Sequence, residues 1–184
     1  MSKLYAFLAD GMEEVECLAV VDIARRGGIQ VETVSIMGRR EVTGSHNITV
    51  LADRLFEETE VLPGDTLFLP GGGKGVENLT AHEGLAAVLK DSAARGDRIA
   101  AICAAPSVLG GLRLLAGRTA TSYPTWRDKV PCGTWTMEGV VTDGPFTTAR
   151  GLGFAIDLGL ELVRLLVSPE EAQTVKERIQ HPDC

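Results

Sequence analysis

Residues 99–106 read Ile-Ala-Ala-Ile-Cys-Ala-Ala-Pro, a short apolar run that ends in one cysteine before an Ala-Ala-Pro step. The apolar run is typical of a buried strand, and the segment through Leu115 has a helix-like pattern. Cys103 is therefore predicted on a sharp turn between a strand and a helix. There the helix presents free backbone N–H groups and its positive dipole end, which favour a thiolate. The alternative is a buried structural cysteine.

Strand-like and helix-like segments alternate on both sides of this stretch. Strands are expected at 4–9, 31–36, 66–69, 99–102 and 146–149, and helices at 13–26, 81–95, 154–167 and 169–180. Two hairpins are expected outside this alternation, 41–43 with 48–51 and 135–137 with 140–142. Short buried strands that alternate with helices indicate a mostly parallel sheet covered on both faces. We therefore predict one domain over residues 1–184, an α/β fold built as a three-layer α/β/α sandwich.

Composition limits the possible partners. The chain has 184 residues, 45% of them hydrophobic, which is enough for a sizeable core. Its net charge is −7 and no basic run interrupts the acidic balance, so no specific binding to nucleic acid or membranes is expected. The apolar segment at 4–9 is too short for a secretory signal or a membrane span. A cytoplasmic location is predicted.

The cysteines and histidines exclude several kinds of site. No Cys-x-x-Cys pair occurs, so neither a zinc knuckle nor a disulfide framework is expected, and neither a metal nor a cofactor is predicted. A cysteine protease or glutamine amidotransferase needs a histidine beside its nucleophile, and His181 in the expected solvated tail is the only one after Cys103. The remaining cysteines are Cys17, beside Glu16 and a candidate neighbour of Cys103 in space, Cys132 in a loop and Cys184 at the end.

Glu16 is the second candidate for chemistry. Ligands of such folds bind at the carboxyl ends of the strands, where the loops at 10–16, 70–75 and 103–106 are expected to meet. Ala19, Val20 and Ile23 follow Glu16 at helical spacing, so its carboxyl lies on an apolar, inward face. Burial raises a carboxyl pKa, and a protonated Glu16 could donate a hydrogen bond to a Cys103 thiolate. The alternative is a first-turn acid that offsets the helix dipole.

The glycine run at 71–75 follows a predicted strand. It lacks the spacing and the Lys-Ser/Thr ending of a phosphate-binding P-loop. Glycine lets backbone N–H groups approach a substrate closely, so Gly72 together with Ala104 could form an oxyanion hole beside Cys103. The alternative is simply a tight turn from strand to helix.

Four motifs together resemble the DJ-1/ThiJ/PfpI superfamily, and most closely its parkinsonism-associated branch. The motifs are Asp10-Gly11-Met12-Glu13-Glu14-Val15-Glu16, Leu69-Pro70-Gly71-Gly72, Ala101-Ile102-Cys103-Ala104-Ala105-Pro106 and Thr148-Ala149-Arg150-Gly151. The resemblance covers nearly the whole chain. It implies a flavodoxin-like fold, also described as class I glutamine amidotransferase-like, and a homodimer.

The resemblance also assigns roles to residues. Cys103 matches the oxidation-prone nucleophile, Glu16 the protonated glutamate, and Gly72 and Ala104 the backbone donors. Three further residues, Gly71, Tyr123 and Arg150, are candidates for the pocket. Tyr123 stands where the parkinsonism-associated protein has a histidine, which puts a proton shuttle at that place in doubt.

Two functions follow from the resemblance. The first is a cysteine-dependent stress-response enzyme acting on small aldehydes, namely α-oxoaldehydes such as methylglyoxal or their early protein adducts, as a glutathione-independent glyoxalase or deglycase. The second is a non-catalytic sensor of oxidative stress or a redox-regulated chaperone that uses oxidation of Cys103.

Overall fold

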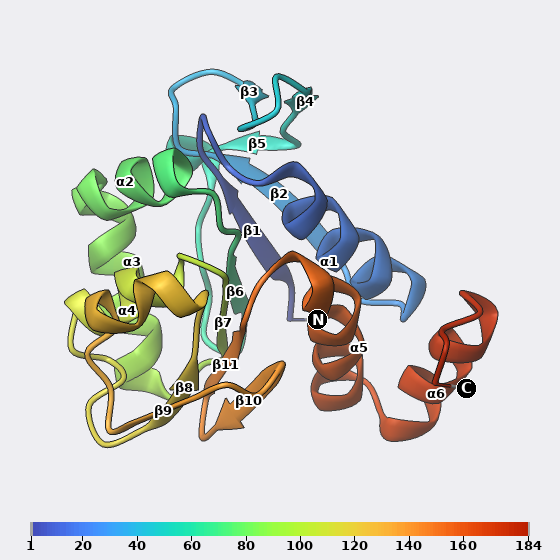
Figure 1. Cartoon of the computed structure of the whole chain (residues 1–184). Helices are drawn as coiled ribbons and strands as arrows, with labels where there is room; N and C mark the ends of the chain where they lie inside the picture. The colour runs from blue at the N-terminus through green and yellow to red at the C-terminus, as the bar shows by residue number, and fades with distance from the viewer. Residues whose placement is uncertain (1, 184) are drawn as a thin grey trace.

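The computed structural model describes residues 2–183, which contain a seven-stranded sheet of order β10-β11-β7-β6-β1-β2-β5 (Figure 1). All neighbouring strands are parallel except β10 and β11. The five inner parallel strands have the order that flavodoxin-like folds share. The strands are β1 (Leu4–Leu8), β2 (Val31–Ser35), β5 (Arg54–Leu55), β6 (Thr66–Leu69), β7 (Ile99–Ile102), β10 (Val140–Asp143) and β11 (Phe146–Ala149).

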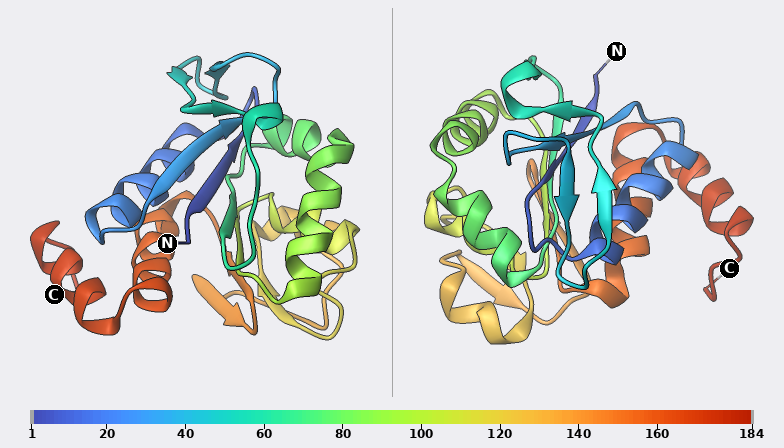
Figure 2. Two further views of the ribbon diagram at one scale, coloured as in Figure 1. Left: turned by 180° about the vertical axis from the view of Figure 1, so that it is seen from behind. Right: turned by 90° about the horizontal axis from the view of Figure 1, so that it is seen from above.

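Helices cover both faces of this sheet, which confirms the predicted three-layer sandwich (Figures 1 and 2). One face carries α1 and α5, with α6 packed outside α5, and the other carries α2, α3 and α4. The helices are α1 (Glu14–Arg26), α2 (Gly73–Ala81), α3 (Glu83–Arg95), α4 (Pro106–Gly111), α5 (Ala155–Leu166) and α6 (Pro169–Arg178). No helix within residues 2–183 is long and apolar enough to cross a membrane.

Strand β1 shows why the sheet must be covered twice. All five of its residues are buried. Leu4, Ala6 and Leu8 join the apolar core shared with α1 and α5, whereas Tyr5 and Phe7 join the core beneath α2 and α3. Successive side chains of a strand point to opposite faces, so a run without polar residues places apolar surface on both sides.

Two predictions about elements were wrong, and one helix before the confirmed α3 was not predicted. The second hairpin does not form: β9 (Thr134–Thr136) pairs with β8 (Thr119–Thr121), while β10 turns back into β11. The helix expected at 81–95 is preceded by α2, and His82 separates the two by capping the backbone N–H of Leu85. The helix after Cys103 ends at Gly111 rather than Leu115.

The first predicted hairpin is confirmed as β3 (Glu41–Thr43) with β4 (Thr49–Leu51), and Glu14 ties it to α1. The hairpin stands at the carboxyl-end edge of the sheet, beside the loop from β1 to α1 (Figures 1 and 2). The buried Glu14 carboxylate accepts hydrogen bonds from the backbone N–H of His46 at 2.7 Å and of Ile48 at 3.3 Å. Glu14, in the first turn of α1, therefore anchors the hairpin to this helix.

This contact predicts a loss of stability in acid. Burial raises the pKa of Glu14, but hydrogen bonds from backbone N–H groups outweigh it and lower the pKa to about 2. A lowered pKa stabilises the fold above the ordinary pKa of 4.5, and the benefit is lost as pH falls toward 2. We expect up to about 3 kcal/mol to disappear over this window. Unfolding of wild type and Glu14→Gln by denaturant between pH 2 and pH 6 measures the difference; equal pH dependence in both proteins would contradict the role of Glu14.

Candidate active site

Cys103 stands on a sharp turn between β7 and α4, as the sequence predicts. Its φ of +63° lies in the left-handed region, which non-glycine residues seldom adopt and which often marks functional sites. Two backbone hydrogen bonds fix this conformation: the Cys103 N–H donates to the Ala149 carbonyl at 2.9 Å, and the Tyr123 N–H donates to the Cys103 carbonyl at 2.8 Å. The first N–H groups of a helix have no partner within the helix, and Pro106, the first residue of α4, has no N–H group that would need one. The half-buried sulfur is thus rigidly displayed at the end of the strand.

The Cys103 sulfur is surrounded by one carboxyl group and two backbone donors. The Glu16 carboxyl acts on the thiol to raise its pKa, and the backbone N–H groups of Ala104 and Gly72 face it and lower its pKa. The other side of the carboxyl is held as well, because the Gly71 N–H donates to Glu16 Oε2 at 3.1 Å and the Leu152 N–H also donates to the carboxyl. The structure therefore brings Cys103, Glu16, Gly71, Gly72 and Ala104 together at the carboxyl ends of β1, β6 and β7.

Burial and mutual contact shift the pKa values of both side chains. Burial is the main cause that raises the pKa of Glu16, which is 1% exposed, to about 7. Burial and the negative charge of an ionised Glu16 raise the pKa of the Cys103 thiol to about 12. The second cause vanishes when Glu16 is protonated, because a neutral carboxyl donates its hydrogen bond to the sulfur. Between these two pKa values the pair carries one proton, whose position determines whether Cys103 is a thiolate.

Two glycines make this close arrangement possible. A Cβ added at Gly71 would collide with the Glu16 carboxyl and would lie 2.6 Å from the Cys103 Cβ. Gly72 has a φ of +92°, and a Cβ there would lie 2.5 Å from the Glu13 nitrogen. The absence of a side chain at Gly71 therefore lets the backbone after β6 lie directly against Glu16 and Cys103. A tight turn from strand to helix would not by itself require this close approach.

Other predicted residues lie at the edge of this cluster or away from it. Tyr123 touches Cys103 through its backbone, and its side chain is 47% exposed at the surface. The Arg150 guanidinium points to the Met137 carbonyl at 2.7 Å and lies over the Phe154 ring, so it is engaged elsewhere. Cys17 is fully buried, and burial raises its pKa to about 12. Cys184 lies outside the described residues.

The prediction that His181 is solvated was wrong. Its side chain is only 9% exposed, and its Nε2 lies 3.4 Å from an Asp157 carboxylate oxygen. No histidine is among the groups that act on Cys103 within residues 2–183. A histidine-dependent hydrolase mechanism therefore has no support in the described part of the chain.

Sequence reasoning missed two members of the site. Glu13 caps α1, its carboxylate accepting from the Glu16 N–H at 2.7 Å, and its charge adds to the raised pKa of Glu16. Leu152 contributes only its backbone N–H. The cap could have been predicted, because Glu13 directly precedes the first residue of α1. The Leu152 N–H could not, because no pattern of side chains indicates which distant backbone group will reach Glu16.

One group of side chains has the composition of a metal site. Ligand atoms of Glu13, Glu14 and His46 all lie within 4.8 Å of one another. Both Glu14 oxygens already accept hydrogen bonds from the β3–β4 hairpin, and Glu13 caps α1. These contacts are sufficient to explain why the three side chains lie together, since they join α1 to the β3–β4 hairpin.

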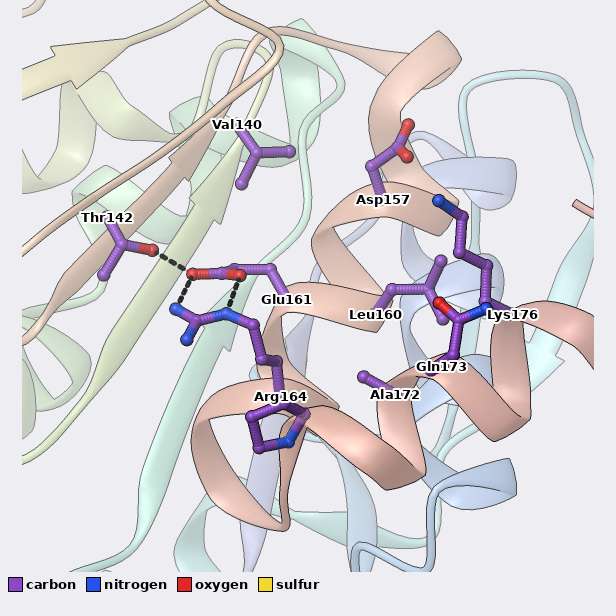
Figure 3. A pocket seen from close by; sticks show the side chains of 10 residues that line it. Val140, Thr142, Asp157, Leu160, Glu161, Arg164, Ala172, Gln173 and Lys176 are labelled. Atoms are coloured by element: carbon purple, nitrogen blue, oxygen red, sulfur yellow. Dashed lines mark hydrogen bonds and ion pairs between the residues drawn. The ribbon is translucent and has the colours of Figure 1, made fainter. Parts of the chain in front are cut away.

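A separate pocket of about 380 Å³ lies between β10, α5 and α6 (Figure 3). Its central carboxylate, Glu161, accepts two hydrogen bonds from Arg164 and one from Thr142. None of the residues that line it belongs to the Cys103 cluster. It therefore takes no part in the chemistry considered for Cys103.

The sequence as a whole has clear relatives. A sequence model of the DJ-1/PfpI family matches residues 2–165. The Parkinson disease protein 7 homolog of Danio rerio is 35% identical over 178 residues, which cover 95% of this chain and 94% of that protein. A protein named deglycase from Thermococcus kodakarensis is 32% identical over 166 residues, which cover 89% of this chain and 99% of that protein.

Solved structures agree with the sequence relatives. A cysteine-to-alanine mutant of a DJ-1 superfamily protein from Salmonella typhimurium superposes with a TM-score of 0.92 at 35% identity, covering 99% of this chain and 100% of that one. An oxidized DJ-1 from Toxoplasma gondii gives a TM-score of 0.91 at 31% identity, covering 98% of both chains. Similarity of this extent includes every element that carries the Cys103 cluster.

Proposed function

Since this chain belongs to the DJ-1/PfpI family, we propose that it is a cysteine-dependent stress-response enzyme that converts α-oxoaldehydes such as methylglyoxal, or their early protein adducts, without glutathione. The observation that carries this proposal is the set of contacts on one atom. The Cys103 sulfur faces a carboxyl group with a raised pKa and two backbone N–H donors. Such a site combines a nucleophile, a proton carrier and an oxyanion hole.

The first step is the attack of the Cys103 thiolate on the aldehyde carbon. A carbon–sulfur bond forms, and the carbonyl π electrons move onto oxygen. The N–H groups of Gly72 and Ala104 stabilise this developing negative charge. Protonated Glu16 then gives its proton to the oxygen, which leaves a neutral hemithioacetal and a Glu16 carboxylate.

The second stage moves a hydrogen between the two substrate carbons. The Glu16 carboxylate removes the proton from the former aldehyde carbon, which gives an enediolate, and then returns this proton to the former keto carbon, while the hydroxyl proton moves from the former aldehyde oxygen to the former keto oxygen. The product is a thioester of a 2-hydroxy acid on Cys103. Water then attacks the thioester carbonyl and gives one proton to the Glu16 carboxylate, and the carbon–sulfur bond breaks, which releases the 2-hydroxy acid, the Cys103 thiolate and a protonated Glu16. With methylglyoxal the product is lactate, so one water is consumed and no oxidant or reductant is needed.

Lactate formation tests this function. We expect wild type to form lactate from methylglyoxal in buffer free of thiols, and Cys103→Ala to be slower by at least about 10³-fold, since removal of a covalent nucleophile has effects of this size. Equal rates in the two proteins would refute the role of Cys103. If neither protein shows turnover, the enzyme proposal itself is wrong.

The second candidate function is a redox sensor or redox-regulated chaperone. It is favoured by the absence of histidine from the groups acting on Cys103 and by donors that suit a sulfur-bound anion. The thiolate would attack peroxide, with one oxygen going to sulfur as sulfenic acid and the other leaving as hydroxide. Intact mass after mild peroxide treatment tests it. Oxygen on Cys103 without any lactate formation would favour the sensor, whereas an unmodified Cys103 would exclude it.

A further inference from the structure

Glu13 joins the first turn of α1 to the glycine loop that follows β6. Its Oε2 accepts a hydrogen bond from the Glu16 N–H at 2.7 Å. Its backbone N–H donates to the Gly71 carbonyl at 2.9 Å, and its carbonyl accepts from the N–H of the buried Cys17 at 3.2 Å. Both the backbone and the carboxylate of Glu13 are therefore fixed beside Glu16.

The backbone of Glu13 also reaches the Cys103 side of the site. The Gly71 carbonyl and the Gly72 N–H belong to one peptide unit, and in a trans peptide bond such as this one they point in opposite directions. The Glu13 N–H holds the carbonyl, so the N–H on the other side of the same unit is held toward the Cys103 thiol, which it faces. Glu13 is therefore part of the frame that holds both members of the pair.

The charge of Glu13 acts on one member of the pair. It raises the pKa of Glu16, whereas the charge that raises the pKa of the Cys103 thiol is that of Glu16 itself. The Glu13 side chain is only 13% exposed, so water screens its charge incompletely. A negative charge favours the protonated form of a neighbouring carboxyl. In a pair that shares one proton, this effect moves the proton toward Glu16 and leaves the thiolate on Cys103.

The other titratable groups around Glu13 come from α1 and from the β3–β4 hairpin. Its Oε1 lies 3.9 Å from Nδ1 of the exposed His46, and the same nitrogen lies 3.3 Å from Glu14 Oε2. The Cys17 thiol is neutral at pH 7, since burial raises its pKa to about 12. Within residues 2–183, no lysine or arginine forms an ion pair with Glu13. Its charge is therefore left to act on Glu16.

We propose that Glu13 is a positioning residue whose carboxylate, fixed against the Glu16 backbone, keeps the shared proton on Glu16 and so maintains Cys103 as the nucleophile. Glu13 acts through Glu16 and needs no contact with the substrate. The inference deepens the proposed function and rests on it in one respect, because it takes Cys103 and Glu16 as the reactive pair. The mechanism requires a protonated Glu16 for its first step, and Glu13 supplies the charge that favours this form.

Three substitutions of Glu13 separate its charge from its shape. Glu13→Gln keeps the length of the side chain and an oxygen that can accept from the Glu16 N–H, but it carries no charge. Glu13→Asp and Glu13→Asn are shorter, are both good helix caps and differ from each other only in charge. The pH at which Glu16 loses its proton is measured from the carbon chemical shift of its carboxyl in ¹³C-labelled protein, a signal identified by its loss in Glu16→Gln.

The titration midpoint of Glu16 should follow the charge at Glu13. We expect it to fall by at least about one pH unit in both Glu13→Gln and Glu13→Asn, and to stay near the wild-type value in Glu13→Asp. Asp22→Asn, which removes an exposed charge from the same helix, should leave the midpoint unchanged. An unchanged midpoint in Glu13→Gln, or a shift that follows side-chain length instead of charge, would overturn the proposal.

The titration needs no substrate, so it separates this inference from the proposed function. A lower midpoint in Glu13→Gln together with no lactate formation by wild type would uphold the role of Glu13 and reject the enzyme. Lactate formation by wild type together with equal midpoints in wild type and Glu13→Gln would uphold the enzyme and reject the role of Glu13.

Discussion

Replacing Glu16 by leucine is expected to raise the pKa of the Cys103 thiol and to slow its alkylation by iodoacetamide at pH 7 by about 10- to 100-fold. The protonated carboxyl donates a hydrogen bond to the thiolate, and a hydrogen bond to a charged group contributes about 1.5–3 kcal/mol, which corresponds to about 1–2 pKa units. Leucine preserves the buried volume but offers no donor. The rate constant is measured as a function of pH by intact mass.

Glu16→Gln is the matched control for this experiment. Its amide can donate a hydrogen bond to sulfur but cannot ionise, so its alkylation rate should lie between those of wild type and Glu16→Leu. Faster alkylation of Glu16→Leu than of wild type would contradict the account. That result would mean that Glu16 is ionised and that its charge holds the proton on Cys103.

Replacing Gly71 by alanine is expected to reduce turnover about 100-fold while the protein still folds. The new methyl group would collide with the Glu16 carboxyl and lie 2.6 Å from the Cys103 Cβ, so the two reactive groups must separate. Displacements of about 1 Å at a catalytic group can cost about 100-fold in rate. Overpacking at this buried position should also cost about 1–3 kcal/mol of stability, measured by denaturant unfolding.

Gly73→Ala is the control for the Gly71 substitution. Its Cβ would meet only the Trp126 ring at an ordinary contact distance of 3.8 Å. Gly73 begins α2, where alanine is a better helix former than glycine. We therefore expect wild-type stability or slightly more. Similar losses of activity in the two variants would show that the loop tolerates no side chain anywhere, and the specific contact at Gly71 would then be wrong.

The layers of the fold could be predicted because each depends on a local pattern. Strand β7 and the turn at Cys103 follow from one apolar run and the Ala-Ala-Pro step after it. The pairing of Thr134–Thr136 could not be predicted, since this strand joins the preceding strand β8 in parallel, across the connection at 122–133, rather than β10, which follows it after a short turn. A hairpin prediction assumes that adjacent strands pair, and here tertiary contacts override that preference.

The candidate site was predictable in its side chains but not in its backbone contacts. The inward position of Glu16 follows from the apolar residues that share its helix face, and its raised pKa follows from burial. The N–H group of Leu152 comes from the 3-10 helix η3 (Leu152–Phe154), far along the chain, so nothing near Glu16 in the sequence indicates it. The burial of His181 against Asp157 depends likewise on how the C-terminal segment packs on α5.

The measurement that tests the account most directly is the ultraviolet absorbance of thiolate as a function of pH, with Cys103→Ala subtracted from wild type. The proposed mechanism needs the shared proton to sit on Glu16, so it predicts a Cys103 thiolate signal that is present at pH 7 and disappears only in acid. A thiolate signal that first rises near pH 12 would place the proton on sulfur beside an ionised Glu16. That result would contradict the account, because the resting enzyme would then lack its nucleophile.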